Sequence, residues 1–296
     1  MATLYTQQDK NISRTWLLMG VFLVVVVGIG YFLSYYYNNP GILYIAIIFS
    51  IGMNIVSFWY SDKIVTKLAG AHEVSREGTY RDLHMIVENL AITAGLPKPK
   101  VYVILDTAPN AFATGRDPKH AVVAVTTGLL ALLNKTELEG VIAHELSHIG
   151  NRDILLSTVA AVLVGFVTIL SDMFLRSMWW GGGRREDREG GSNILAIVGI
   201  IFVLLSPLFA QLIHFAISRK REYLADASGA LLTRYPEGLA SALEKIAGAS
   251  APLRHQSKAI AHLYLADPRG LSSKIATLFQ THPPIKDRIK ALLGGK

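Results

Sequence analysis

Two histidines and a glutamate with a spacing that suits metal chemistry stand near the middle of the chain, in the segment Thr136–Asp153. His144, Glu145 and His148 form an H-E-x-x-H motif there. Residues four apart lie on one face of an α-helix, so both imidazole rings can bind one ion. Glu145 lies one position further round, where it can reach a water on that ion without binding the ion itself. The pattern is typical of zinc-promoted hydrolysis with the glutamate as general base.

The motif requires a helix, and the surrounding residues predict one. Thr136 and Glu139 match a capping box, which places the start of the helix at Thr136. Apolar residues follow at helical spacing, namely Leu138, Val141, Ile142 and Ile149. We therefore interpret the segment as a helix with an apolar face, and not as a surface helix that carries its two histidines by chance.

A catalytic zinc site needs a third protein ligand and an open position for water. The chain has no cysteine, which excludes a thiolate. A pattern with glycine and histidine three and six residues after His148 is also excluded, because Asn151 and Ile154 stand there. We assign Glu222 as the third ligand, and Asp226, on the same helical face, as a carboxylate that orients a histidine ligand. The alternative for Glu222 is an ordinary salt bridge with a neighbouring basic residue.

Composition and hydropathy indicate a membrane protein. Of the 296 residues, 51% are hydrophobic and only 17% are charged, and the mean hydropathy is +0.36. A span needs about 20 apolar residues. Four uncharged runs are candidates, although the third is short, and they lie at 15–37, 41–61, 154–171 and 194–218.

These runs divide the chain into four parts. Residues 1–61 are an N-terminal segment with a transmembrane hairpin, and residues 154–218 are the third and fourth spans with their loop. Residues 62–153 and 219–296 are the two parts of a cytoplasmic catalytic domain. Lys10 and Arg14 favour a cytoplasmic N-terminus, whereas the arginines between the last two runs oppose the orientation that follows for their loop.

The same division supports the choice of the third metal ligand. His148 precedes the third run closely, and Glu222 follows the fourth closely. With continuous helices, both residues lie within about 10 Å of one membrane surface. Glu237 and Glu244 are further along the chain and are less favoured. The net charge of +7 is spread among acidic residues and suits basic cytoplasmic faces better than nucleic-acid binding.

A small sheet is predicted before the motif. Residues 101–105 and 121–126 are rich in β-branched residues and predict two strands. An edge strand of such a sheet commonly pairs with the backbone of a peptide substrate. We assign this role to the four residues between the strands, Asn110, Ala111, Phe112 and Ala113.

The fold class that follows is an α-helical membrane protein with about four transmembrane helices. Its catalytic domain is a mainly helical α+β zincin with a small sheet. Further helices are predicted at 83–94, 222–232 and 236–247, and after Pro283 and Pro284.

These features together resemble the HtpX family of membrane zinc endopeptidases, which is related to the CAAX prenyl proteases. The likeness rests on the N-terminal hairpin, on Glu222 with Asp226, and on the stretches Pro109–Gly115, His144–Asp153, Thr281–Pro284 and Arg288–Ile289. The resemblance implies a gluzincin-type fold, one Zn²⁺ per chain, and a multi-pass protein of the bacterial plasma membrane with its site facing the cytoplasm. The implied substrates are polypeptides, including misfolded or damaged membrane proteins, often under stress.

His282 is a further candidate catalytic residue. It precedes a helix that Pro283 and Pro284 open, and a helix N-terminus can hold a side chain rigidly where negative charge is favoured. Together with the resemblance, which puts this histidine at the active-site cleft, the placement suggests a donor to the oxyanion. The alternative is that His282 only caps its own helix.

Three other functions remain as alternatives. A CAAX-prenyl-protease-like processing enzyme shares the motifs but has more spans than this length and hydropathy allow. A membrane scaffold with a structural zinc site has no use for Glu145 as a base. A zinc transporter needs ligands at midplane depth, where His214 is the only candidate. The oligomeric state is left open.

Overall fold

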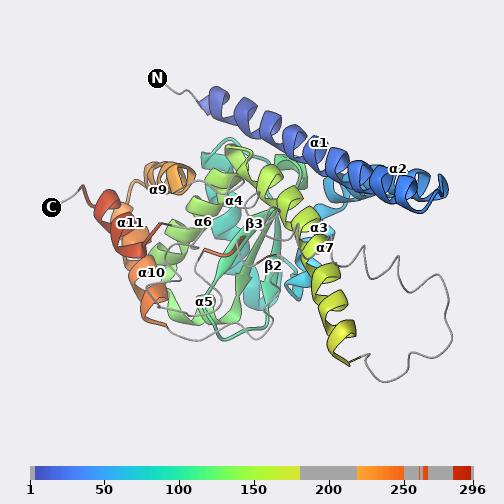
Figure 1. Ribbon diagram of the computed structural model, residues 1–296. Helices are drawn as coiled ribbons and strands as arrows, with labels where there is room; N and C mark the ends of the chain where they lie inside the picture. Colours follow the sequence, from blue (N-terminus) through green and yellow to red (C-terminus); the bar gives the residue numbers. More distant parts are fainter. Residues whose placement is uncertain (1–3, 181–218, 250–259, 261–262, 266–282, 295–296) are drawn as a thin grey trace.

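The computed structural model describes residues 4–180, 219–249, 260, 263–265 and 283–294 of the chain (Figure 1). Two long helices lie side by side along one side of a body in which further helices surround a sheet. In chain order, the α-helices and strands are α1 (Leu4–Tyr36), α2 (Gly41–Trp59), α3 (Ser61–Leu68), β1 (Ala71–Glu73), α4 (Arg81–Thr93), β2 (Lys100–Ile104), β3 (Ala111–Thr114), β4 (Val122–Thr126), α5 (Thr127–Leu132), α6 (Lys135–Gly150), α7 (Asp153–Trp180), α9 (Arg219–Thr233), α10 (Pro236–Gly248) and α11 (Ile285–Leu292).

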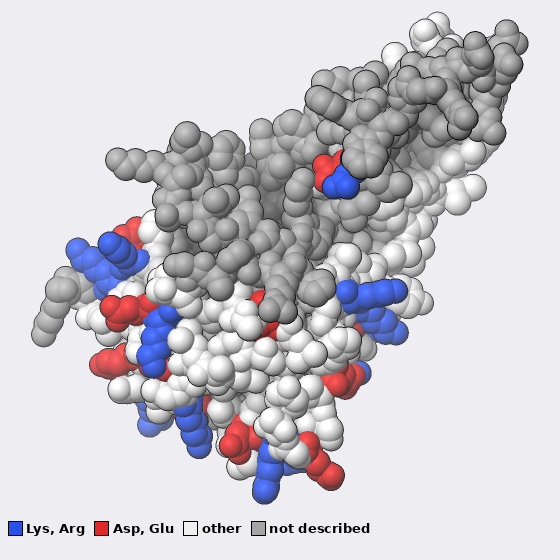
Figure 2. Space-filling view, turned by 90° about the horizontal axis from the view of Figure 1, so that it is seen from below, with Lys and Arg blue, Asp and Glu red and all other residues white. Residues whose placement is uncertain are grey.

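Helices α1 and α2 form the predicted hairpin. Both are long and apolar enough to cross a membrane, over Gln7–Tyr36 and Gly41–Trp59. Among the described residues, one further pair, Lys135–Gly150 with Asp153–Thr168, meets the criterion only when its two helices are taken together, and it is bent by 83°. The expected third run lies in α7, and the fourth, 194–218, lies outside the described residues. Figure 2 shows red and blue side chains gathered on the rounded body, whereas the described residues visible along the projecting part are almost all white.

Helix α1 starts earlier than the hydropathy indicated, at Leu4 and not near residue 15. Its polar first turns belong to the helix because they dock on the body. The Gln8 side chain donates to the Gly150 carbonyl at 2.6 Å, and Asn11 is completely buried. The first membrane helix therefore reaches beyond its apolar run to the end of α6.

The sheet has the strand order β1-β2-β4-β3. Strands β2 and β4 are parallel, and the two outer pairs are antiparallel. Both predicted strands are confirmed, with ends shifted by one residue. Strand β3 was predicted only as a substrate-binding edge, and it is indeed an edge strand, although Asn110 lies just before it.

Helices cover both faces of the sheet, because side chains along each strand alternate between them. On one face, Val101, Val103 and Val123 pack in one apolar cluster with residues of α4, α6 and α10. On the other, Ile104, Phe112 and Ala124 pack with residues of α3 and α7. The sheet thus holds α6 against a rigid layer.

The cap of α6 corrects the sequence analysis. The helix begins at Lys135, and its capping box consists of Asn134 and Glu137 instead of Thr136 and Glu139. The Asn134 Oδ1 accepts from the Glu137 backbone N–H at 3.0 Å, while Glu137 accepts from the Asn134 N–H at 2.9 Å. Glu137 is also bound by Ser241 and Lys245 of α10, so the cap that forms is the one that packing supports.

Candidate active site

Helix α6 presents the motif inside the body. Val141, Ile142 and Ile149 are fully buried, as their spacing predicted, and they fix which side of the helix faces the core. His144 and Glu145 are buried as well, and the side chain of His148 is 16% exposed. Helical spacing brings the two imidazoles together with their Nε2 atoms 3.1 Å apart and their rings edge to face.

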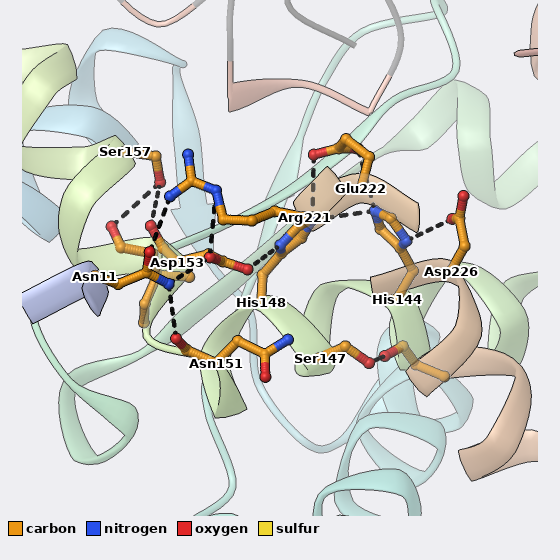
Figure 3. A network of polar contacts seen from close by, with 12 residues as sticks. Asn11, His144, Ser147, His148, Asn151, Asp153, Ser157, Arg221, Glu222 and Asp226 are labelled. Carbon is orange, nitrogen blue, oxygen red and sulfur yellow. Dashed lines mark hydrogen bonds and ion pairs between the residues drawn. The ribbon is translucent and has the colours of Figure 1, made fainter. Parts of the chain in front are cut away.

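Glu222 of α9 faces both rings. Its Oε1 lies 3.7 Å from the His148 Nε2, and its Oε2 lies 3.8 Å from the His144 Nε2. The ligand atoms of the three residues all lie within 4.8 Å of one another. A salt bridge with the neighbouring Arg221 does not form, since Arg221 turns to Asp153 and Asn11 (Figure 3). A basic residue from elsewhere in the chain does approach Glu222, because the Arg288 Nη1 lies 3.7 Å from its Oε2.

Two glycines permit the close helix contacts that build this cluster. A Cβ at Gly229 of α9 would lie 2.9 Å from the His144 backbone nitrogen, which no side chain could tolerate without a shift of the backbone. At the other end of α6, a Cβ at Gly140 would lie 2.7 Å from the Leu239 nitrogen of α10. The glycines let α9 and α10 approach α6 backbone to backbone.

His144 is oriented by a buried ion pair. Its Nδ1 lies 2.9 Å from the Asp226 Oδ1. The Arg288 guanidinium of α11, which is fully buried, donates to both Asp226 oxygens at 2.9 and 2.6 Å. Burial alone would raise the pKa of Asp226, but Arg288 and His144 hold it at about 2. Asp226 thus lies where sequence analysis placed it, beside a histidine of the motif.

His148 is oriented by a second aspartate, which sequence analysis missed. The Asp153 Oδ2 lies 3.0 Å from the His148 Nδ1, and the Asn11 Nδ2 donates to the Asp153 Oδ1 at 2.7 Å (Figure 3). The Asn11 Nδ2 also donates to the Asn151 carbonyl at 3.0 Å, and its Oδ1 accepts from Arg221 at 3.1 Å. The only sequence signal was the aspartate at the end of the motif segment. Nothing pointed to Asn11.

The electrostatics of the site favour a positive charge near His148, because the carboxylates of Glu222, Asp153 and Glu145 surround it. Burial lowers the pKa of His148, but the Asp153 hydrogen bond and the charges of Glu222, Asp153 and Glu145 raise it to about 9. Burial raises the pKa of Glu145, while both histidines oppose the shift. A carboxylate with a raised pKa is suited to accept and return a proton near neutral pH.

The expected substrate edge is partly occupied by the chain itself. The Asn110 carbonyl accepts from Thr126 within the sheet, so the next carbonyl, that of Ala111, points to the outer side. It accepts from the Leu265 N–H at 3.0 Å, and Tyr264 packs its ring edge to face against Phe112.

The remaining catalytic candidate, His282, lies outside the described residues. The structure describes the chain again from Pro283, and α11 begins at Ile285.

Comparisons with known proteins identify the family of the chain. Residues 77–295 match the family described as "Peptidase family M48". A "Protease HtpX homolog" from Thermoanaerobacter pseudethanolicus is 51% identical over 295 residues, which cover 98% of this chain and 97% of the relative. Another from Pyrococcus furiosus is 49% identical over 282 residues, 94% of each chain. The crystal structure of S. mikatae Ste24p is 17% identical with a TM-score of 0.49, and the match covers 97% of this chain and 67% of that one.

The full-length relatives favour an HtpX-like protease over a CAAX-type processing enzyme or a scaffold. The two apolar helices of the hairpin fit the membrane character that the sequence predicted. The chain therefore belongs to peptidase family M48 and is a membrane metalloprotease that acts on polypeptides.

Proposed function

We propose that the protein is a zinc-dependent endopeptidase that cleaves misfolded or damaged membrane proteins. The observation that carries the zinc-dependent part of this proposal is the orientation of the two histidines, and the substrate class rests on the similarity to the HtpX homologs. Each ring has its Nδ1 beside an aspartate and its Nε2 facing Glu222, so both Nε2 atoms are directed to one point. Aspartates at Nδ1 are the usual means of fixing the tautomer of a metal-binding histidine.

The residues present fit zinc. Two nitrogens bound to a tetrahedral ion at about 2.0–2.1 Å lie roughly 3.3 Å apart, close to the 3.1 Å between His144 and His148. Two imidazoles with one carboxylate form a common catalytic zinc set that keeps a position open. The carboxylates that raise the pKa of His148 stabilise positive charge on its ring, and they would stabilise a divalent cation bound in place of the proton in the same way. We therefore assign His144, His148 and Glu222 as the ligands of one Zn²⁺.

Glu145 is assigned as the general base. Zinc in such a site acts as a Lewis acid that acidifies water and polarises the scissile carbonyl. Glu145 takes the proton of the attacking water and returns a proton to the leaving amine, and its raised pKa suits both steps. The buried Asp226–Arg288 pair holds His144 in place throughout.

The substrate is proposed to lie extended beside the Asn110–Ala113 edge, next to the Leu265 N–H that already occupies the Ala111 carbonyl, with His282 as a donor to the oxyanion. Support for His282 comes from the position of α11, the helix that follows it in the sequence. The Arg288 Nη2 of α11 lies 3.4 Å from the His144 Nδ1, so this helix lies beside the motif. If His282 donates, His282→Phe should lower turnover about a hundredfold and leave the zinc content unchanged. Full turnover, or loss of metal, would remove this role.

Four spans with a cytoplasmic site remain our topology. The hairpin supports two of them, and α3 starts the body directly after α2. Because the chain has no cysteine, single engineered cysteines report sidedness cleanly. A cysteine at Asn39 should label from outside, and one at Ser272 only after permeabilisation. Labelling of Asn39 from the cytoplasm alone would invert the topology.

Glu145→Gln tests the catalytic assignment. The variant should keep about one zinc per chain and lose nearly all cleavage of an unfolded substrate, because it removes the base and not a ligand. Glu139→Gln is the matched control on the same helix and should cleave normally. Zinc-dependent cleavage that persists in Glu145→Gln would assign the base elsewhere, and wild-type protein that binds zinc but never cleaves would favour a structural site.

A further inference from the structure

A pocket of about 560 Å³ lies where the second membrane helix meets the body, away from the motif. Ile55, Trp59 and Tyr60 supply its apolar wall at the end of α2. The residues opposite are mostly basic, namely Lys63, Lys100, Arg116, Lys119 and His120, with Asp62 as the one carboxylate in the lining. The pocket therefore combines an apolar side that belongs to a membrane helix with a cationic side that belongs to the body.

Arg116 fixes the cationic side to the membrane helix. Its guanidinium lies over the Trp59 ring, 4.7 Å from the centroid, and its Nη1 donates to the Trp59 carbonyl at 3.2 Å. The Nη2 lies 2.7 Å from the His120 Nε2. These contacts hold a positive charge at the level where α2 leaves its apolar run. A tryptophan at this position is typical of a membrane interface.

The charges in the pocket are only partly neutralised from within the protein. Lys100 pairs with Glu73 at 3.2 Å, and Arg116 lies 3.5 Å from an oxygen of Asp117. Lys63 and Lys119 are exposed and form no ion pair with the part of the chain that the structure describes. Two amino groups thus remain available to an anion from outside.

An apolar track on α2 leads into the pocket. Ile48, Ile51 and Ile55 precede Trp59 at spacings of three and four, so they lie on one helical face. All four side chains are exposed, and Trp59 is 53% exposed. A free inorganic anion would not contact these apolar side chains, whereas the acyl chain of a lipid could pack along them with its headgroup at the cationic side of the pocket.

We propose that this pocket binds the phosphate headgroup of an anionic phospholipid, whose acyl chains lie along the Ile48–Trp59 face of α2. Basic pockets beside membrane helices bind anionic headgroups by charge, and each cation near such a surface contributes about a factor of five in affinity. The site is separate from the metal cluster, so its test does not depend on proteolysis.

The test uses the full-length protein in detergent micelles and counts retained lipids by native mass spectrometry. Wild-type protein should retain dioleoyl phosphatidylglycerol in preference to dioleoyl phosphatidylcholine. In Lys63→Gln/Lys119→Gln, the affinity for phosphatidylglycerol should fall about 25-fold. Arg81→Gln/Lys135→Gln removes the same charge from other exposed positions of the body and should bind like wild type.

Soluble competitors distinguish a lipid from a free anion. Inorganic phosphate and glycerol phosphate, which lack acyl chains, should leave phosphatidylglycerol bound at millimolar concentrations. Displacement by either would identify a site for soluble phosphates and overturn the proposal. Equal retention of the two lipids by wild type, or an equal loss in both double variants, would overturn it too.

Discussion

The two histidines of the motif are oriented from opposite parts of the molecule. His144 is held from within the body, by Asp226 of α9 and Arg288 of α11. His148 is held from the membrane side, by Asp153 at the start of α7 and Asn11 of α1. Both supports place an aspartate on Nδ1, but they differ in what holds the aspartate.

The difference is one of charge and geometry. Asp226 receives two short hydrogen bonds from one buried guanidinium. Asp153 receives one from a neutral amide, and Arg221 approaches it only to 3.6 Å. Charge-assisted bidentate pairs are the stronger kind. The His144 support is therefore the stronger of the two, while the His148 support links the site to the first membrane helix.

Removal of Arg288 should have the largest effect. Arg288→Met leaves Asp226 buried without its partner, which costs about 3–5 kcal/mol. Arg221→Met is the matched control, because that buried arginine contacts a neutral amide and a more distant carboxylate. Chemical denaturation in micelles should show a clearly smaller loss for Arg221→Met. Equal losses would mean that the two supports do not differ in strength.

Neutralising the two aspartates should weaken zinc binding to different extents. Removing partners of metal-binding histidines typically costs 10–100-fold in affinity. We expect Asp226→Asn near the upper end and Asp153→Asn near the lower end, because the first also breaks the Arg288 pair. Competition with a chelator measures both constants. The reverse order would make the membrane-side support the dominant one.

Asn11→Leu should have a smaller effect, since Asn11 acts through Asp153. The change removes the hydrogen bond to Asp153 Oδ1, and zinc affinity should fall by about three- to tenfold. This is less than the roughly 10–100-fold expected when a direct partner of a histidine is removed. The control is Asn54→Leu in α2, another buried asparagine, which bonds the Met19 carbonyl between the two helices. If both variants lower the affinity alike, hairpin packing explains the result and Asn11 has no specific role.

Changes at the cap of α6 should be the smallest and should affect neither support. Asn134→Ala removes the capping side chain and should lower the free energy of unfolding by about 1 kcal/mol. Thr136→Ala, at the position first predicted as the cap, should cost less. Zinc affinity should be unchanged in both. A larger effect of Thr136→Ala on stability would restore the helix start that the sequence indicated.

The parts of the site that could be predicted are those that local spacing fixes. His144 and His148 converge because they are four apart on a helix, and Asp226 faces the same cluster as Glu222 for the same reason. Strands β2 and β4 were found because β-branched runs mark them within a residue of their ends, whereas the short β1 was not predicted. The family resemblance added the C-terminal residues around Arg288.

The parts that were missed depend on contacts between distant segments. Asn11 and Asp153 are separated by 142 residues, and a polar residue before an apolar run reads only as the flank of a span. Leu265 meets Ala111 through backbone atoms, which leave no trace in residue type. The true cap of α6 was chosen by contacts with α10. Such contacts follow from packing, which a single sequence does not display.

The close approach at Gly229 and Gly140 has a consequence for how the gene can vary. Neither glycine has a side chain to take part in chemistry, yet any replacement would push α9 or α10 away from the backbone of α6. In a saturation mutagenesis selection for activity, both codons should tolerate substitution as poorly as those of the proposed metal ligands. Glycines in open surroundings, such as Gly20 and Gly52, should accept alanine freely.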